Sequence, residues 1–346
     1  MILRSLPELF WRVTISMPLI VRNRTSPISG SKNRSITYDD GQVSSSTRPA
    51  MTVAMTMWSV IAVSCSFLVG AEDIVKRAGP FGEGKMIVDQ RIDDGTPFDW
   101  GRASADYAKY RDIYPEQFYQ MILNRGLCRD AQHVLDLGTG TGVLPRHMAQ
   151  YGATWVGIDV SEQQIEQARL LSAGIPNIEY QVSSAEDVDF PDASFDVITA
   201  CQCYWYFDHE IVCKKLHRLL KPGGRLLFLV MEWLPFEDAI AGASEQLVLK
   251  YSPHWSGAGE RMHPIVIPAC YSTGFTLVHH EERKLTVPFT RNSWNGRMKA
   301  CRGIGASLAP EQVAAWEREH LAMLERIAPE RFSILHYAAL AELERI

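Results

Sequence analysis

The chain has 346 residues, 46% of them hydrophobic and 22% charged, which is typical of a soluble globular protein of one or two domains. Residues 1–85 carry ten Lys and Arg against six Asp and Glu, whereas residues 86–346 carry 25 against 34. An acidic body argues against a nucleic-acid partner, because proteins that bind nucleic acid present a basic surface.

The first 85 residues differ in composition from the rest. Residues 21–50 are rich in Ser, Thr, Arg and Asn without an apolar period, which indicates disorder. Residues 51–71 carry no charge and are long enough to cross a bilayer, although five Ser and Thr interrupt them. Gly82-Glu-Gly-Lys-Met86 would be encoded by a purine-rich tract before a methionine codon, as at a bacterial ribosome-binding site. We expect residues 1–85 to be a disordered or leader-like extension, with native translation starting at Met86; a membrane anchor at 51–71 is the alternative.

The central motif of the chain lies at residues 133–142, where a short apolar run leads into a turn with three glycines and then a helical pattern. Glycine lets the backbone approach a ligand closely and adopt a positive φ. A dinucleotide site would need its third glycine at the position of Val143. Here the pattern is G-x-G-x-G, preceded by a carboxylate at Asp136. An acid there suits an ammonium or sulfonium group, and Asp159, at the end of the next apolar run, can accept hydrogen bonds from both hydroxyls of a ribose.

Residues 134–142, together with Asp159, resemble the class I S-adenosylmethionine (SAM)-dependent methyltransferases of the methyltransferase type 11 kind. The resemblance implies SAM as the cofactor, with a Tyr/Arg segment, matched by Tyr107 and Arg111, covering its methionyl end. In this family an acid after the third strand commonly binds the adenine amino group. Ser184 occupies that place here and Glu186 lies two residues further on. The implied cofactor-binding residues are Tyr107, Arg111, Asp136, Gly138, Gly140, Gly142, Asp159, Val160, Ser184, Ala185, Glu186 and Cys201.

Strands and helices alternate regularly after residue 132, which indicates right-handed βαβ units and a parallel sheet. Strands are predicted at 133–137, 154–159, 178–182, 195–200 and 225–231. Residues 275–281 and 284–289 are predicted to form two antiparallel edge strands with a tight turn, and residues 311–346 to be helical. The expected fold is α/β, Rossmann-like and doubly wound, with a mostly parallel seven-strand sheet, an antiparallel edge hairpin and a helical C-terminal part. Residues 86–346 would form one methyltransferase domain, with acceptor-binding insertions in about 232–346.

The side chains that would choose the acceptor are harder to predict. The aromatic run after the fourth strand can contact a sulfonium by cation–π attraction or pack an apolar acceptor. An arginine in the C-terminal part can bind a substrate carboxylate, as similar small-acid methyltransferases suggest, or can lie on the surface. The candidate substrate-binding residues are Tyr204, Trp205, Trp233, Trp255 and Arg297. No catalytic residue is evident; His254 and His263 are candidate general bases.

Cys201-x-Cys203 has no nearby His or Cys pair to complete four ligands, so no metal site is predicted. The seven cysteines lack the spacing of a disulfide framework, which is typical of reduced thiols in a cytoplasmic protein. The predicted activity is methyl transfer from SAM to a small-molecule acceptor by in-line displacement. A nicotinamide-dependent oxidoreductase and a non-catalytic SAM-binding protein are the alternatives.

Overall fold

The computed structural model describes residues 86–346. The expectations for residues 1–85, a disordered or leader-like extension with an uncharged stretch at 51–71, lie outside the described residues. Within residues 86–346, no helix has both the length and the apolar character that crossing a bilayer requires.

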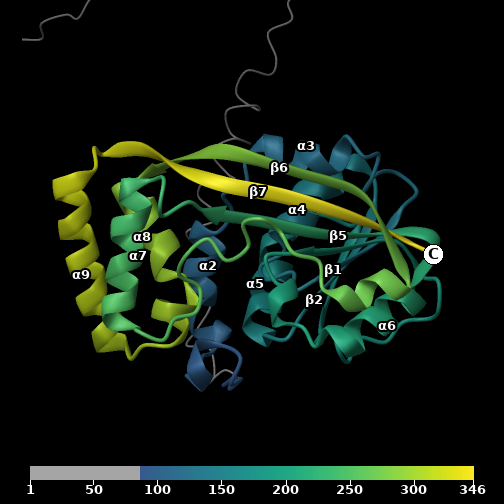
Figure 1. Ribbon diagram of the computed structural model, residues 1–346, viewed down its shortest axis with the longest axis horizontal. Coiled ribbons are helices and arrows are strands. Elements are labelled where there is room, and N and C mark those ends of the chain that lie inside the picture. The colour runs from purple at the N-terminus through teal and green to yellow at the C-terminus, as the bar shows by residue number, and fades with distance from the viewer. Residues whose placement is uncertain (1–85) are drawn as a thin grey trace, which may run out of the picture. The chain divides into compact units, whose positions relative to one another are not determined.

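A seven-stranded sheet in the order β3-β2-β1-β4-β5-β7-β6 organises the fold (Figure 1). The strands from β3 to β5 pair in parallel, and β7 runs antiparallel to both β5 and β6. The strand order reverses between β1 and β4, which is where ligands bind in sheets of this type. The strands are β1 (His133–Leu137), β2 (Thr154–Asp159), β3 (Ile178–Val182), β4 (Phe195–Cys201), β5 (Leu220–Trp233), β6 (Phe275–Thr290) and β7 (Arg331–Arg345).

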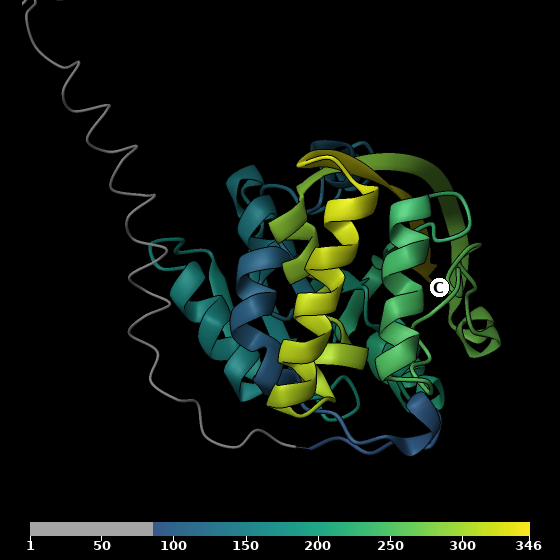
Figure 2. The same cartoon turned by 90° about the vertical axis from the view of Figure 1, so that its left-hand side faces the viewer.

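Helices cover the sheet, and several begin at a residue whose side chain caps the free N–H groups. The side chain of Ser161 accepts from Gln164 N at the start of α5, and Asp208 accepts from Ile211 N at the start of α6. The α-helices are α2 (Ser104–Tyr110), α3 (Glu116–Leu123), α4 (Val143–Met148), α5 (Glu162–Leu171), α6 (His209–Leu219), α7 (Ala239–Tyr251), α8 (Arg291–Lys299) and α9 (Pro310–Ile327). The short helical turns include η1 (Asp93–Gly95), η2 (Trp100–Ala103), η4 (Tyr204–Tyr206) and η6 (Arg302–Ala306). Both views show α7, α8 and α9 side by side at the end of the sheet to which β5 leads (Figures 1 and 2).

Each face of the sheet has its own apolar core, because successive side chains of a strand point to opposite faces. On β1, Val134 belongs to one core and Leu135 to the other. On β5, Leu227 and Leu229 join the first core, whereas Phe228 joins the second. Full burial of such a side chain stabilises the fold by roughly 1.5–3 kcal/mol. The two cores therefore fix the register of the central strands and, with it, the positions of the loops at their carboxyl ends.

The predicted seven-strand, mostly parallel sheet is confirmed, but two details at its antiparallel edge were wrong. Residues 275–281 and 284–289 are not a tight hairpin: they belong to one continuous strand, β6, with a bulge between Leu277 and His279. Residues 311–346 are helical only in α9, and the chain then forms strand β7. Ala338, Ala339 and Ala341 favour helix locally, yet all three are buried between β5 and β6. Pairing on both sides overrides that local preference.

Candidate active site

A cavity of about 470 Å³ lies at the carboxyl ends of the parallel strands. Its size is in the range of pockets that hold cofactors and other small ligands, roughly 300–1,000 Å³. One part of the wall comes from the glycine turn and the ends of β2 and β3, and includes Gly138, Gly140, Asp159, Val160, Ser183, Ala185 and Glu186. The rest comes from segments before β1 and after β4, from the end of β5 and from segments after it, and includes Trp100, Tyr107, Arg111, Cys203, Trp205, Glu232, Trp233, Trp255, Arg297 and Arg302. The cavity thus joins the predicted cofactor residues to the predicted acceptor segment.

The glycine turn brings bare backbone to the cavity. Gly138 and Gly140 have φ values of +57° and +56° and line the cavity. A Cβ on Gly138 would lie 2.7 Å from Cys203 Cβ, whereas a Cβ on Gly140 would meet Tyr107 Cε1 at 3.5 Å, an ordinary van der Waals contact. Gly142 does not line the cavity, because it packs on the ring of Tyr180, whose hydroxyl a Cβ would approach to 2.1 Å. The structure therefore brings two of the three predicted glycines to the cavity and gives the third a packing role.

The two predicted acids lie on neighbouring strands but in different environments. Asp159, at the end of β2, lines the cavity and accepts hydrogen bonds from Gly140 N and Ser161 N, each at 2.9 Å. Burial raises its pKa. Asp136 is only 2% exposed and does not line the cavity, because its Oδ1 turns toward Thr199 on β4, whose hydroxyl donates at 2.6 Å. Burial raises the pKa of Asp136 to about 6. Only Asp159 is therefore placed to contact a bound ligand directly.

The loop after β3 contributes Ser183, Ala185 and Glu186 to the cavity, but not Ser184. The Ser184 hydroxyl donates to Asp187 Oδ2 at 2.8 Å and accepts from Asp187 N at 3.0 Å, so it is engaged in a local turn. Glu186 lines the cavity and also accepts from Asp208 N at 2.8 Å. The residue at the usual acidic position therefore faces away, and Glu186 is the acid on this side.

The segment before β1 covers the glycine turn. Tyr107 and Arg111 both line the cavity and lie against one another. Arg111 Nη2 donates to the Tyr107 hydroxyl at 2.9 Å, and the guanidinium lies 4.5 Å from the Tyr107 ring centroid. The Trp100 ring packs edge-on against Tyr107 with centroids 6.1 Å apart. Helical spacing alone was enough to place these two side chains on one face.

The acceptor candidates divide into two groups. Trp205, Trp233, Trp255 and Arg297 line the cavity. Tyr204 does not: it is 3% exposed and its hydroxyl donates to Val266 O at 3.3 Å. Cys201 does not line the cavity either, and its thiol donates to the Tyr114 hydroxyl. Cys203, two residues further on, lines the cavity.

Neither candidate general base is in the site. His254 is exposed and lies 2.9 Å from Asp94 through Nδ1. His263 stacks on Tyr337 and contacts Glu260 through Nδ1 at 3.1 Å. Neither side chain lines the cavity, so the structure does not bring either of these candidate bases to it. A loop histidine carries no signal in the sequence for the direction of its side chain.

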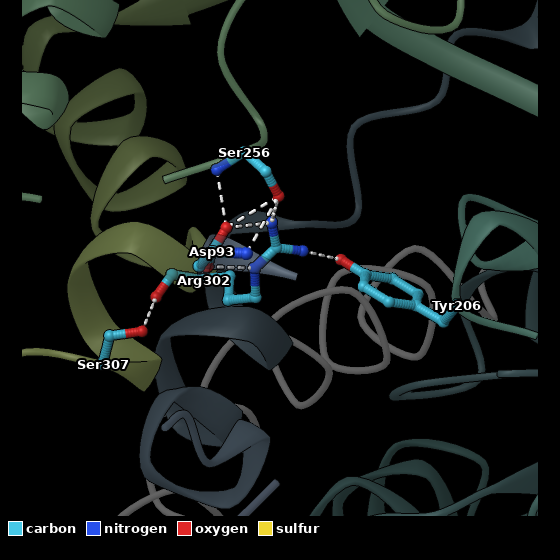
Figure 3. A network of polar contacts seen from close by, with 5 residues as sticks. All are labelled: Asp93, Tyr206, Ser256, Arg302 and Ser307. Atoms are coloured by element: carbon cyan, nitrogen blue, oxygen red, sulfur yellow. Dashed lines mark hydrogen bonds and ion pairs between the residues drawn. The ribbon is translucent and has the colours of Figure 1, made fainter. Parts of the chain in front are cut away.

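A buried network that sequence reasoning missed ties four distant segments together at the wall (Figure 3). Arg302 donates to both oxygens of Asp93 at 2.6 and 2.8 Å, to Ser256 Oγ at 2.8 Å and to the Tyr206 hydroxyl. Asp93 and Arg302 are 3% and 6% exposed. Burial alone would raise the pKa of Asp93, but the hydrogen bonds from Arg302 and Ser256 lower it on balance. The partners lie far apart in the chain, so no local pattern could have identified them.

Glu232 is a second residue that sequence reasoning missed. It lies near the carboxyl end of β5, lines the cavity and accepts a hydrogen bond from Met262 N at 3.1 Å. Burial raises its pKa to about 8, and the nearby charges of Glu260 and Glu245 act in the same direction. Its carboxyl group therefore holds a proton near neutral pH. Within residues 86–346, no group of three or more His, Cys, Asp or Glu side chains is arranged to hold a metal ion.

Comparison with known proteins places this geometry in context. A family model described as a methyltransferase domain matches residues 135–228, which include the glycine turn and Asp159. A ubiquinone biosynthesis O-methyltransferase of Neisseria meningitidis is 31% identical over 176 residues, 49% of this chain and 71% of that protein. An uncharacterized methyltransferase of Schizosaccharomyces pombe is 30% identical over 126 residues, 36% of this chain and 49% of that protein. The chain thus spans about half the length of this and similar curated relatives. The solved structure of the YcgJ protein from Bacillus subtilis aligns with a TM-score of 0.44 at 21% identity, over 67% of this chain and 100% of that one.

Proposed function

This chain belongs to the SAM-dependent methyltransferase family, and on that basis we propose that it transfers the methyl group of SAM to a small-molecule acceptor. The observation that carries the proposal is one continuous cavity with two unlike parts. The glycine turn, Asp159 and the loop after β3 form one part, and Trp233, Trp255 and Arg297 belong to the other. Methyl transfer needs both reactants held in line in one place, because alignment supplies much of the rate.

The cofactor part of the cavity has features that fit SAM. Gly140 leaves room for close approach of a ligand, and Asp159 beside it retains lone pairs for ribose hydroxyls. Gln164 lines the same region, and its buried Oε1 has no hydrogen-bond donor within the described part of the chain. A ligand that brings hydroxyl or ammonium donors would satisfy this oxygen. We infer that Gly138, Gly140, Asp159, Gln164, Ala185 and Glu186 hold the nucleoside, with Tyr107 and Arg111 at the methionyl end.

Methyl transfer from SAM mainly requires the protein to align the two reactants and to exclude water from them. When bound, SAM supplies a methyl group already activated by its attachment to a sulfonium. The rings of Trp205, Trp233 and Trp255 would shield the reacting atoms from water and hold the body of the acceptor. The proton on the carboxyl group of Glu232 can be donated in a hydrogen bond to the acceptor below about pH 8. Above that pH the same carboxylate can accept a proton.

We further infer a cytoplasmic location. The six cysteines of residues 86–346 are free thiols, and three of them, Cys201, Cys203 and Cys301, lie in or behind the cavity wall. Free thiols beside a reactive site are best preserved in a reducing compartment.

Calorimetric titration with SAM tests the cofactor site. Asp159→Ala should weaken SAM binding about tenfold or more, because charge-assisted hydrogen bonds to the ribose are lost. Asp189→Ala removes a carboxylate that is 84% exposed and pairs with Arg218, so it should bind SAM as the wild type does. Equal affinity of the Asp159 variant and the wild type would refute the assignment.

Incorporation of labelled methyl groups into small molecules of a cell extract tests the transfer itself. The Neisseria relative is named for methylation of an oxygen atom, so hydroxylated acceptors are the first to examine. Tight SAM binding without any labelled product would favour a non-catalytic SAM-binding protein instead.

A further inference from the structure

Arg297 is a buried cation in the cavity wall that has no anion to pair with in residues 86–346. It lies on α8, is 3% exposed and lines the cavity. In the part of the chain that the structure describes, its Nη1 donates only to Cys301 Sγ, at 3.5 Å, and its Nε is buried without an acceptor. The guanidinium lies 4.9 Å from the ring centroid of Trp233. The interpretation of Arg297 as a surface arginine was therefore wrong.

Arg302, a buried arginine on the same wall, differs from Arg297 because it pairs with a carboxylate. Arg302 is 6% exposed and donates to both oxygens of Asp93. Among the described residues, no carboxylate lies within ion-pair distance of Arg297. Burial, together with the nearby charge of Arg111, lowers the pKa of Arg297 to about 10, which still leaves it positive at neutral pH. Because a buried charge is unfavourable unless it is paired, this arginine requires an anion that residues 86–346 do not supply.

The arginines in the cavity wall that lack an ion pair indicate how many anionic groups the bound ligands carry. Two of the lining arginines, the half-buried Arg111 and the buried Arg297, have no ion pair in residues 86–346. SAM carries a single carboxylate, at its methionyl end. Arg111 is held by Tyr107, whose ring lies next to Gly140, so Arg111 is the guanidinium next to the glycine turn. If the methionyl carboxylate pairs with Arg111, Arg297 is left for a second anion.

The surroundings of Arg297 describe the molecule that carries this second anion. Trp233 lies under the guanidinium, and the Trp255 ring lies next to Trp233 with centroids 6.4 Å apart. Both rings line the cavity and offer an apolar surface beside the charge. We propose that Arg297 binds a carboxylate of the acceptor, so that the acceptor is a small organic acid with an apolar body. This inference rests on the proposed methyl transfer.

The first test compares stability without any ligand. In Arg297→Met, an unpaired buried charge is replaced by an apolar side chain, so its Tm should equal or exceed that of the wild type. Arg302→Met is the matched variant, and its Tm should fall because Asp93 is left unpaired. A loss of Tm in Arg297→Met as large as that in Arg302→Met would mean that Arg297 is structural, and would overturn the proposal.

The second test adds probe ligands to protein saturated with S-adenosylhomocysteine. Benzoate, phenylacetate and indole-3-acetate are compared with their uncharged amides by thermal shift. At least one acid should raise the Tm of the wild type more than its amide does. Arg297→Met should bind that acid about tenfold more weakly or worse, while the exposed variant Arg326→Met retains wild-type affinity. If none of the acids stabilises the wild type more than Arg297→Met, the proposal is wrong. Stabilisation by inorganic phosphate alone would replace the carboxylate by a phosphate.

Titration with SAM separates this proposal from the one on which it rests. Arg297→Met should bind SAM with the affinity of the wild type. Loss of SAM binding in this variant would mean that Arg297 holds the methionyl carboxylate, which overturns the inference about the acceptor. Failure of the wild type to bind SAM would refute the proposed function instead, and the acid titrations would still report on the anion site.

Discussion

Replacement of Glu232 by glutamine tests whether the cavity keeps a carboxylic acid protonated near neutral pH. In the native protein burial raises the pKa of this group from 4.5 to about 8. In the unfolded chain it should ionise near its ordinary value. Between these two pKa values the native state holds one more proton than the unfolded state does, so the free energy of unfolding falls as pH rises.

The size of the effect follows from that single proton. The slope is 2.303RT, or about 1.4 kcal/mol per pH unit. Between about pH 6.0 and pH 7.5 the wild type should therefore lose about 2 kcal/mol more stability than Glu232→Gln, which is neutral at both pH values. Other titrating groups, such as Asp136, cancel in this difference.

Urea denaturation followed by tryptophan fluorescence at the two pH values measures the effect. Glu325→Gln, an exposed substitution on α9, is the control and should keep the pH dependence of the wild type. If Glu232→Gln and the wild type lose the same stability between the two pH values, Glu232 is ionised in the native protein at pH 6.0. The proposed proton on its carboxyl group would then be wrong.

Two further predictions concern stability. Arg302→Met leaves Asp93 buried and unpaired, so the free energy of unfolding should fall by about 3–5 kcal/mol in a denaturation experiment, and adding Asp93→Asn should recover part of the loss. Gly142→Ala should destabilise more than Gly174→Ala, because both positions have positive φ but only the Cβ at 142 would meet the Tyr180 hydroxyl, at 2.1 Å. Backbone strain should cost each variant about 1–2 kcal/mol, and overpacking should cost Gly142→Ala about 1–3 kcal/mol more. Equal Tm values for the two glycine variants would show that Tyr180 moves without cost.

The central half of the fold could be predicted because its signals are local. The bounds of β2 and β3 agree with those expected from the apolar runs at 154–159 and 178–182. β7 could not be predicted in the same way, since its alanines favour helix and only pairing with β5 and β6 makes them a strand. A strand could therefore be predicted where its own residues indicate one, but not where only pairing with its neighbours makes it a strand.

The residues of the candidate site also fall into two groups: those that could be predicted from local sequence and those that depend on tertiary packing. Asp159 ends a predicted strand, Gly140 and Ala185 lie three residues beyond the ends of two others, and all three line the cavity. Asp93 and Arg302 meet only because η1 and η6 pack at the same wall, and nothing in either segment identifies the other. Whether Arg297 is exposed or buried also depends on tertiary packing, because a single arginine on a helix has no pattern of its own.

The segment between β6 and β7 leaves the sheet and returns to it in a way that affects how the lining of the cavity can vary among relatives. Thr290, the last residue of β6, is the register partner of Arg331, the first residue of β7, and Arg291 N donates to Glu330 O at 3.2 Å. Residues 291–330, which include Arg297 and Arg302, therefore depart and return at a single rung of the ladder. A segment attached in this way can change in length without changing the register of β6 and β7. Relatives that share the glycine turn would then be free to differ in the molecules that they recognise.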